Sequence, residues 1–187
     1  KTPGELLDLD LRKERFISKL EELIDKFYKK MLDIYKEVVE GVLAVPVYEG
    51  QKTPSERFAG AVDTYSIEAM MKDGKAVQAG TSHYMGTKFA EAFDIKYLTK
   101  ENEHVHAHTT SWGVSTRLIG SLIMTHGDEQ GLVLPPKVAP TQVVLIPVGP
   151  WKKNPAILEK LEELQQQLKA AGLRVKIDDT DNSPGFK

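Results

Sequence analysis

An Asp-Gly turn between two alternating segments is the strongest constraint on the fold of this 187-residue chain. Asp73 and Gly74 lie in the turn KDGK, between TYSIEAMM and AVQAGTSHYMG. An Asp-Gly pair flanked by alternating apolar and polar residues is typical of a tight β-hairpin, because both residues tolerate a positive φ. We therefore predict two antiparallel strands here and an antiparallel sheet around them.

A long helix is expected before this hairpin, with a strand between the two. From Leu6 to about Gly41, apolar residues recur at steps of three and four among lysines and glutamates. This spacing places them on one side of an α-helix, which we predict in one or two pieces. The segment LAVPVYEG, residues 43–50, then predicts a short strand.

Three more elements are expected after the hairpin. We predict a short helix leading into a strand over residues 87–99, and a further strand of the sheet over residues 103–113. The apolar positions of STRLIGSLIMTHG predict a helix that begins near Ser115, capped by the hydroxyl of Ser115 or Thr116. Together these elements predict an α+β fold in which helices flank an antiparallel sheet.

The chain changes character after Pro135 and Pro136, which mark the best domain boundary. The apolar run TQVVLIPV is followed by the amphipathic stretch NPAILEKLEELQQQLKAAG, which Gly172 ends, and then by LRVKIDD. A strand, a helix and a second strand in this order predict one β-α-β unit with parallel strands.

Composition excludes several classes of protein. The chain has no cysteine, so it carries no disulfide, thiolate metal site or cysteine nucleophile. Its formal net charge is -2 with 28% charged residues, so any contact with nucleic acid has to be local. No apolar run approaches the roughly 20 residues that cross a bilayer, and the acidic first residues do not resemble a signal peptide. We therefore expect a cytoplasmic protein without a membrane partner.

Three histidines alternate with small apolar residues in the stretch HVHAH. On one strand His104, His106 and His108 would leave the same face, where imidazoles at this spacing can bind zinc and support a zinc-dependent hydrolase. The other interpretation is a solvent-facing strand surface with Val105 and Ala107 packed inward. We favour the second and expect no metal site, because no His-rich helix or glutamate at metal spacing accompanies the histidines.

Arg117 and His83 are further candidates for chemistry. Arg117 follows Ser-Trp-Gly at the start of a predicted helix, where its planar guanidinium suits a phosphate or a nucleobase. Surface arginines at such places also commonly pair with carboxylates. His83 lies beside Thr81 and Ser82 in a strand of small residues, and belongs either to a pocket floor or to an ordinary hydrogen-bonded strand end.

Taken together, these motifs resemble one family. The runs ERFAGAVDTYSIEAMMKDGKAVQAGTSHYMGTKFAEAFDIKY and HTTSWGVSTRLIGSLIMTHGDEQGLVLPPKVAPTQVVLIPV closely resemble prolyl-tRNA synthetase of the type shared by archaea, eukaryotes and some bacteria. The resemblance extends from about Met31 to Lys187. It implies a class II catalytic domain, an antiparallel sheet with flanking helices, followed by the first β-α-β of an anticodon-binding domain.

The resemblance also implies roles for individual residues. SWGVSTR is similar to the family's motif 3, so Arg117 matches the catalytic arginine that stacks on the ATP adenine and meets its phosphates. Gln78 and Thr81 match ATP-binding positions. An apolar, aromatic-lined slot suits the pyrrolidine ring of proline. The residues that match this proline pocket are Phe58, His83, Ser111, Trp112 and Gly113.

The implied activity is that of a proline–tRNA ligase. In the family, the proline carboxylate attacks the α-phosphate of ATP, pyrophosphate leaves, and the prolyl group then passes to the terminal ribose of tRNA. ATP and Mg²⁺ are the implied cofactors, proline and tRNA(Pro) are the implied partners, and the intact family forms homodimers. Catalysis there consists mainly of positioning and charge stabilisation, which fits a chain without an evident Ser-His-Asp set.

The first thirty residues do not show the family's motif 1 or motif 2. Arg12-Lys13-Glu14 matches motif 2 in letters only, since no hairpin loop follows it. We therefore expect a helical segment over 1–30, a partial catalytic domain over 31–140 and a partial anticodon-binding domain over 141–187. Our hypothesis is a truncated or engineered fragment with impaired or no activity. The alternative is a non-catalytic synthetase-like module or designed scaffold that retains an adenylate-binding surface.

Overall fold

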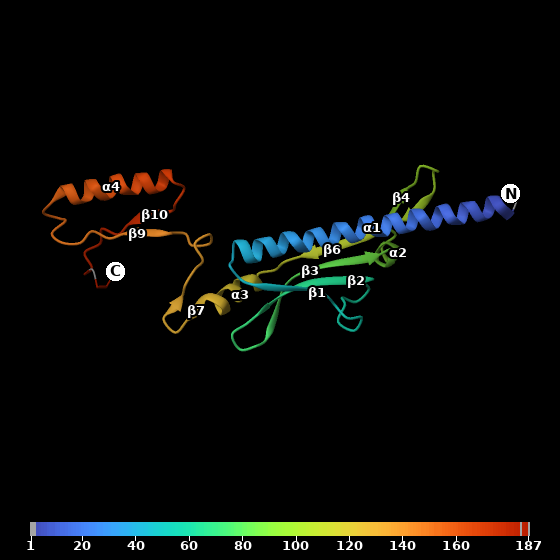
Figure 1. Ribbon diagram of the computed structural model, residues 1–187, viewed down its shortest axis with the longest axis horizontal. Helices are drawn as coiled ribbons and strands as arrows, with labels where there is room; N and C mark the ends of the chain where they lie inside the picture. The colour runs from blue at the N-terminus through green and yellow to red at the C-terminus, as the bar shows by residue number, and fades with distance from the viewer. Residues whose placement is uncertain (1–2, 184, 187) are drawn as a thin grey trace. The chain divides into compact units, whose positions relative to one another are not determined.

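The computed structural model describes residues 3–183 and 185–186, with the side chains of residues 14 and 15 and those from residue 17 onward within these ranges. The chain divides into two compact units, Lys1–Val133 and Leu134–Lys187 (Figure 1). The division falls next to Pro135 and Pro136. Arg12, which resembles motif 2 in letters, lies outside the described side chains.

One continuous helix, α1 (Pro3–Gly41), opens the first unit, so the expected amphipathic helix is not broken into two pieces. Its apolar stripe buries Tyr28, Leu32 and Val39. This burial stabilises the part of the helix from Tyr28 onward, since helical stability in proteins comes mostly from packing an amphipathic face. Although α1 is long, neither it nor any other helix among the described residues has the apolar character that a bilayer crossing requires.

A four-stranded antiparallel sheet lies against α1. Its strands are β1 (Val47–Gln51), β2 (Asp63–Met70), β3 (Ala76–Gly86) and β6 (Thr109–Gly113), in the spatial order β1-β2-β3-β6 (Figure 1). The strand expected within residues 43–50 corresponds to β1. The fold class predicted from the sequence, an antiparallel sheet with flanking helices, is confirmed.

The predicted hairpin joins β2 to β3 and is also confirmed. The amide of Met71 donates to the carbonyl of Lys75 at 2.9 Å, and the amide of Gly74 donates to the carbonyl of Met71 at 2.9 Å. Gly74 has a φ of 79°, the left-handed conformation that glycine adopts without steric cost.

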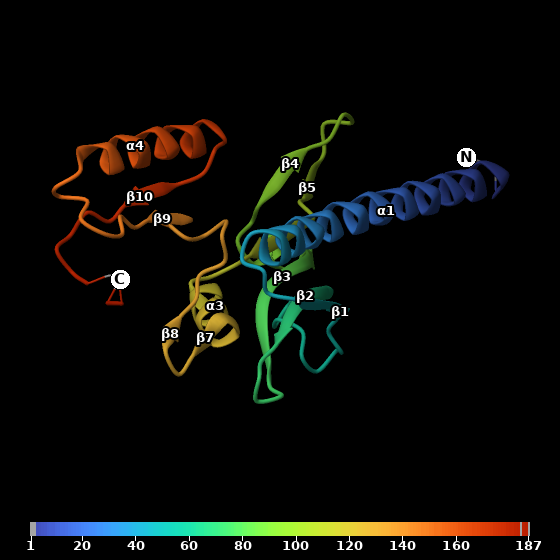
Figure 2. The ribbon, with the colours of Figure 1, turned by 60° about the vertical axis from the view of Figure 1, so that its left-hand side comes forward.

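The prediction of one continuous strand over residues 103–113 is wrong. The segment forms two strands, and only β6 belongs to the four-stranded sheet. The first, β5 (His104–His106), pairs with β4 (Lys96–Leu98) in a separate antiparallel ribbon (Figure 2). The short helix α2 (Lys88–Ala92) leads the chain away from the sheet before β4, and the chain changes partner where the amide of Ala107 donates to the carbonyl of Ile95.

The helix α3 (Arg117–His126) begins directly after β6, close to the predicted start. Of the two hydroxyls proposed as its cap, only that of Ser115 is used: Ser115 Oγ accepts a hydrogen bond from the amide of Arg117 at 3.3 Å. Such a side-chain acceptor satisfies an amide that has no partner within the helix. After α3, the strands β7 (Gly127–Asp128) and β8 (Gly131–Leu132) form a short hairpin.

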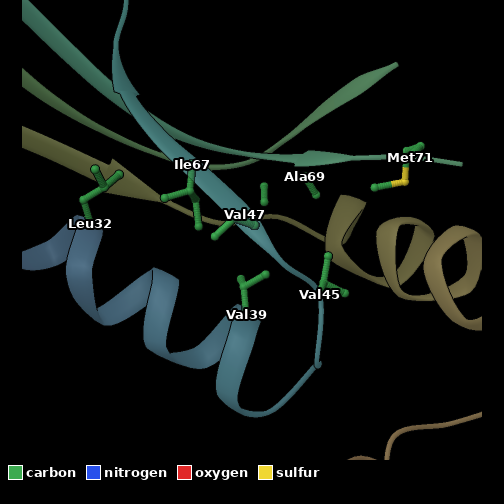
Figure 3. Packing of buried hydrophobic residues seen from close by; sticks show 8 residues of the cluster. Leu32, Val39, Val45, Val47, Ile67, Ala69 and Met71 are labelled. Atoms are coloured by element: carbon green, nitrogen blue, oxygen red, sulfur yellow. The ribbon is translucent and has the colours of Figure 1, made fainter. Parts of the chain in front are cut away.

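The core of the first unit lies between α1 and the sheet. Figure 3 shows Leu32 and Val39 of α1 directed toward the strands, close to Ile67 of β2. The buried members of this cluster are Leu32, Val39, Val45, Val47, Ile67, Ala69, Met71 and Ala79. One side of the sheet is therefore committed to packing.

The second unit is the predicted β-α-β. Its strands β9 (Val143–Leu145) and β10 (Val175–Ile177) are parallel, and α4 (Pro155–Ala170) connects them. Pro155 stands at the start of α4, where its missing amide hydrogen loses no bond. This unit matches the expected opening of an anticodon-binding domain.

Candidate functional site

Register places most predicted site residues on one face of the four-stranded sheet. Residues directly opposite each other in antiparallel strands lie on the same face. On the face toward α1, the Ser82 hydroxyl donates to the carbonyl of Tyr28 at 2.7 Å, and a Cβ atom at Gly80 would lie 3.3 Å from the Tyr35 ring. We call the opposite side the polar face, and it carries Thr64, Ser66 and Glu68 of β2, Gln78, Thr81 and His83 of β3, and Ser111 and Gly113 of β6.

A β-bulge at Ala79 brings Gln78 and Thr81 to the same face. In a regular strand, residues three apart point to opposite sides. Here Gly80 pairs with Ile67 and Gln78 pairs with Glu68, so Ala79 is the extra residue of β3. The bulge shifts the alternation by one residue, and the two positions matched to ATP binding thereby become neighbours.

A pocket of about 280 Å³ lies where β6 ends and the edge of β3 is left without a partner strand. Arg117 reaches back across it and donates from a guanidinium nitrogen to the carbonyl of Gln78 at 3.5 Å. The pocket is lined by Gln78, Ala79, Gly80, Thr81, Gly113, Val114, Ser115 and Arg117. All three residues predicted to bind ATP thus line one pocket.

Among the residues that the structure describes, few hold the Arg117 side chain. Its side chain is exposed, and its one hydrogen bond to the sheet is long. The planar guanidinium therefore has donors available for a phosphate or a nucleobase plane. Among the described residues that line the pocket, Arg117 is the only charged one.

His83 and Phe58 form an aromatic wall on the polar face. Nδ1 of His83 lies 2.9 Å from the hydroxyl of Thr64, and burial lowers the pKa of His83 below its ordinary value. The imidazole is therefore neutral at physiological pH. Phe58 comes from the loop between β1 and β2, and its ring centroid lies 5.4 Å from that of His83 and 6.3 Å from that of Phe89.

The three predicted residues of β6 do not share one side. Ser111 pairs with His83 and Gly113 with Thr81, so both belong to the polar face. Trp112 pairs with Ser82 on the face toward α1, where its ring makes an edge contact with Phe27 at 5.4 Å between centroids. The structure therefore does not bring the Trp112 ring together with Phe58 and His83.

The polar face also carries an ion pair that was not predicted from the sequence. Lys52 Nζ lies 2.5 Å from a carboxylate oxygen of Glu68, which also accepts a hydrogen bond from Ser66 at 3.2 Å. The bond from Lys52 holds the pKa of Glu68 below its ordinary value. Polar residues at alternate positions of the predicted strand TYSIEAMM, residues 64–71, were the available signal, since they lie on the same face as His83.

The three histidines considered as zinc ligands diverge. The His106 ring lies 3.6 Å from the carboxylate of Asp94, whereas Nδ1 of His108 lies 2.6 Å from the hydroxyl of Tyr84. His104 is exposed on β5. Their alternation is lost because the strand ends between His106 and His108. Within the part of the chain that the structure describes, no group of three or more His, Cys, Asp or Glu side chains is arranged to hold a metal ion.

Comparison with known proteins gives two family matches. Residues 11–126 match the tRNA synthetase class II core domain (G, H, P, S and T), and residues 142–187 match the anticodon binding domain.

Curated relatives are similar over most of the chain. The proline–tRNA ligase of Symbiobacterium thermophilum is 61% identical over 158 residues, covering 84% of this chain and 32% of the relative. That of Deinococcus radiodurans is 56% identical over 160 residues, covering 85% and 32%, and that of Salinibacter ruber is 55% identical over 162 residues, covering 85% and 33%. The chain spans about a third of the length of these relatives.

Proposed function

The chain belongs to the class II tRNA synthetase core family, and from this premise we propose that it carries part of the amino-acid-activating site of a proline–tRNA ligase. The observation that supports the proposal most strongly is the pocket that unites Gln78, Thr81 and Arg117 at the end of β6. The aromatic wall of Phe58 and His83 lies on the same face of the sheet as Gln78 and Thr81.

The pocket is proposed to bind ATP. Arg117 lies across the adenine or meets the phosphates with its guanidinium, while the side chains of Gln78 and Thr81 hydrogen-bond the nucleotide. Neutral His83, the Phe58 ring and the backbone at Ser111 and Gly113 form a slot for the pyrrolidine ring of proline. The predicted contribution of Trp112 to this slot stays a prediction, since its ring contacts Phe27.

In the proposed reaction, a proline carboxylate oxygen forms a bond to the α-phosphorus of ATP and the bond to pyrophosphate breaks. The site residues contribute by aligning the two reactants and by balancing negative charge. Transfer of the prolyl group to tRNA follows in the whole ligase. Magnesium is carried over from the family alone, and no step is assigned to it, because the described residues offer no group of three metal-ligating side chains.

Several further predictions are retained as proposals. They are the segments 1–30, 31–140 and 141–187, a homodimer, a cytoplasmic location, and tRNA(Pro) as the partner of the whole ligase. The family match that begins at residue 11 extends into the first of these segments.

A binding module without turnover is the second candidate. The observation that favours it is that Arg117 is the single cation among the described residues of the pocket. The transition state of adenylate formation carries several negative charges on its phosphates, and one cation balances only part of them. Such a chain would bind an adenylate without accelerating its formation.

Two measurements on the full chain test these proposals. Calorimetric titration with a non-hydrolysable prolyl-adenylate analogue is expected to show binding, and the matching alanyl analogue should bind about tenfold more weakly, because it leaves the apolar slot partly unfilled. Equal affinity for the two analogues, or no binding, contradicts the proposed site. Proline-dependent ATP–pyrophosphate exchange then separates the two candidates: exchange supports the enzyme, and binding without exchange supports the module.

A further inference from the structure

One side chain bridges the two ends of the loop between β1 and β2, residues 52–62, whose end residues Lys52 and Val62 also donate backbone hydrogen bonds to the sheet at 2.8 Å. Arg57 donates to the carbonyl of Val62 at 2.6 Å and to the carbonyl of Lys52 at 3.4 Å, and its guanidinium lies 3.5 Å from the carboxylate of Asp63. Arg57 thus joins the first residue of the loop to the last. Only 27% of the Arg57 side chain and 18% of the Asp63 side chain are exposed, so water screens the ion pair less than at an open surface.

Asp63 is itself fixed from several directions. Gln51 donates to both of its carboxylate oxygens, at 2.9 and 2.8 Å, and the amide of Thr64 donates to one of them at 2.8 Å. The hydroxyl of Tyr28 on α1 lies 3.3 Å from the other. The anchor that receives Arg57 is therefore part of the rigid sheet rather than of the loop.

Phe58, the next residue in the loop, is only partly held by its own packing. Its side chain is 53% exposed, and its ring contacts are those with His83 and Phe89. A half-exposed ring has less packing to define its orientation than a buried one. The backbone at Phe58 is held in two ways: the amide of Ala61 donates to the carbonyl of Phe58 at 2.9 Å, and the side chain of the adjacent Arg57 bridges the ends of the loop.

Gly60 supports this interpretation from the far side of Phe58. It has a φ of 91°, and a Cβ atom there would lie 2.8 Å from the Phe89 ring. The loop therefore passes close to that ring in a backbone conformation that few other residues adopt. The loop has a defined path on both sides of Phe58, with Arg57 as its polar anchor.

We propose that Arg57 is a positioning residue: by joining Lys52, Val62 and Asp63 it holds the loop closed and so sets the Phe58 ring against His83. The functional side of this inference rests on the proposed proline slot, of which Phe58 forms a wall. A guanidinium is suited to this task, because its planar fork serves several acceptors at once, whereas the ammonium of lysine is a compact point charge.

The first test measures position without any ligand. Nuclear Overhauser contacts between the ring protons of Phe58 and His83 are compared in the wild type, Arg57→Lys, Arg57→Ala and the control Glu56→Ala. Glu56 is the neighbouring loop residue, and among the described side chains only that of Thr53, in the same loop, donates a hydrogen bond to it. Contacts between Thr64 and His83 report that the sheet is intact.

We expect the Phe58–His83 contacts in the wild type and in Glu56→Ala, and their loss or severalfold weakening in both Arg57 variants, with the Thr64–His83 contacts unchanged. Arg57→Lys guards against a variant that fails to fold, since it keeps charge and length. Undiminished Phe58–His83 contacts in Arg57→Lys and Arg57→Ala would overturn the proposal.

The second test asks whether the position matters for binding. In Arg57→Lys the prolyl-adenylate analogue should bind about tenfold more weakly, a loss typical of one apolar contact in a pocket, while the affinity for ATP alone stays unchanged. An equal loss for both ligands indicates a general structural role and overturns the inference. If the wild type binds no analogue, the proposed function fails, and the ring contacts still decide whether Arg57 positions Phe58.

Discussion

The two faces of the four-stranded sheet carry different kinds of residue and do different work. The face toward α1 has Ile67 and Ala69 at full burial, packed with Val39 of the helix. The polar face carries hydroxyls, an imidazole and an ion pair, with Arg117 at the edge of the sheet beside it. Strand alternation allows one hairpin to supply both, so stability and binding are expected to respond to substitutions on different faces.

The strongest test of this division is a truncation on the helix face. Ile67 is fully buried, and Ile67→Ala should lower the free energy of unfolding by about 2–5 kcal/mol, because it removes apolar contact and leaves a cavity. Ile119→Ala is the matched control, since Ile119 is 60% exposed, and it should change stability by less than about 0.5 kcal/mol. Urea unfolding gives both values. Similar losses for the two variants would mean that the helix face does not hold the core.

The converse test is a truncation beside the polar face. Arg117→Ala should weaken ATP binding about 10- to 100-fold, the effect of losing charge-assisted hydrogen bonds worth about 1.5–3 kcal/mol. Because Arg117 is exposed, unfolding in urea should be nearly unchanged. Arg15→Ala, on the exposed surface of α1, removes the same charge and should leave calorimetric ATP affinity intact. Equal losses in the two variants would point to bulk electrostatics rather than a site.

The third prediction concerns the face of the sheet on which the Trp112 ring lies. Phe27→Ala removes the edge contact with Trp112. It should lower the free energy of unfolding by about 0.5–1.5 kcal/mol in addition to the effect of the buried apolar area that is lost. With Trp151→Phe as background, Trp112 is the only fluorescent tryptophan, and its emission should shift to longer wavelength as the ring becomes more exposed. The control Leu23→Ala, one turn earlier on α1, should leave the emission in place. If the prolyl-adenylate analogue shifts the Trp112 emission in the Trp151→Phe background as far as Phe27→Ala does, the Trp112 ring contacts the ligand and belongs to the proline slot.

Local sequence predicted the elements whose causes are local. The hairpin at Asp73-Gly74, the long helix, and the β-α-β of the second unit follow from turn chemistry and periodicity, and the structure contains them. The prediction of one strand over 103–113 was wrong because the first part of this segment pairs with β4, which α2 places away from the sheet and which lies outside the segment.

The arrangement of the site residues could not be predicted from local sequence. The bulge at Ala79 brings Gln78 and Thr81 to one face, and its only mark in the sequence is the neighbouring Gly80, which indicates an irregular strand without fixing which residues face the same side. The same applies to Trp112, whose side is set by its pairing with Ser82. Family resemblance supplied the candidate residues. Their grouping on one face of the sheet depends on register, which forms only when distant strands meet.

The smallest expected effect comes from His83, which is partly buried on the polar face. Burial lowers its pKa from an ordinary value of 6.5, so between that value and the lower folded pKa the unfolded chain binds more protons than the folded one. Stability should therefore fall as the pH drops below about 6.5 and should be unaffected by this group above it. Urea midpoints measured from pH 7.5 to 5 give the slope.

His83→Gln should flatten this slope, because it removes the titrating group from the polar face. His104→Gln is the matched control: His104 is exposed on β5, so the slope should persist. The helix face offers no such dependence, since its buried cluster of Leu32, Val39 and Ile67 does not titrate. If His83→Gln and the wild type share one slope, then His83 is hydrated in solution and the wall that it forms with Phe58 is open, which is also the arrangement that the Arg57 variants are expected to produce.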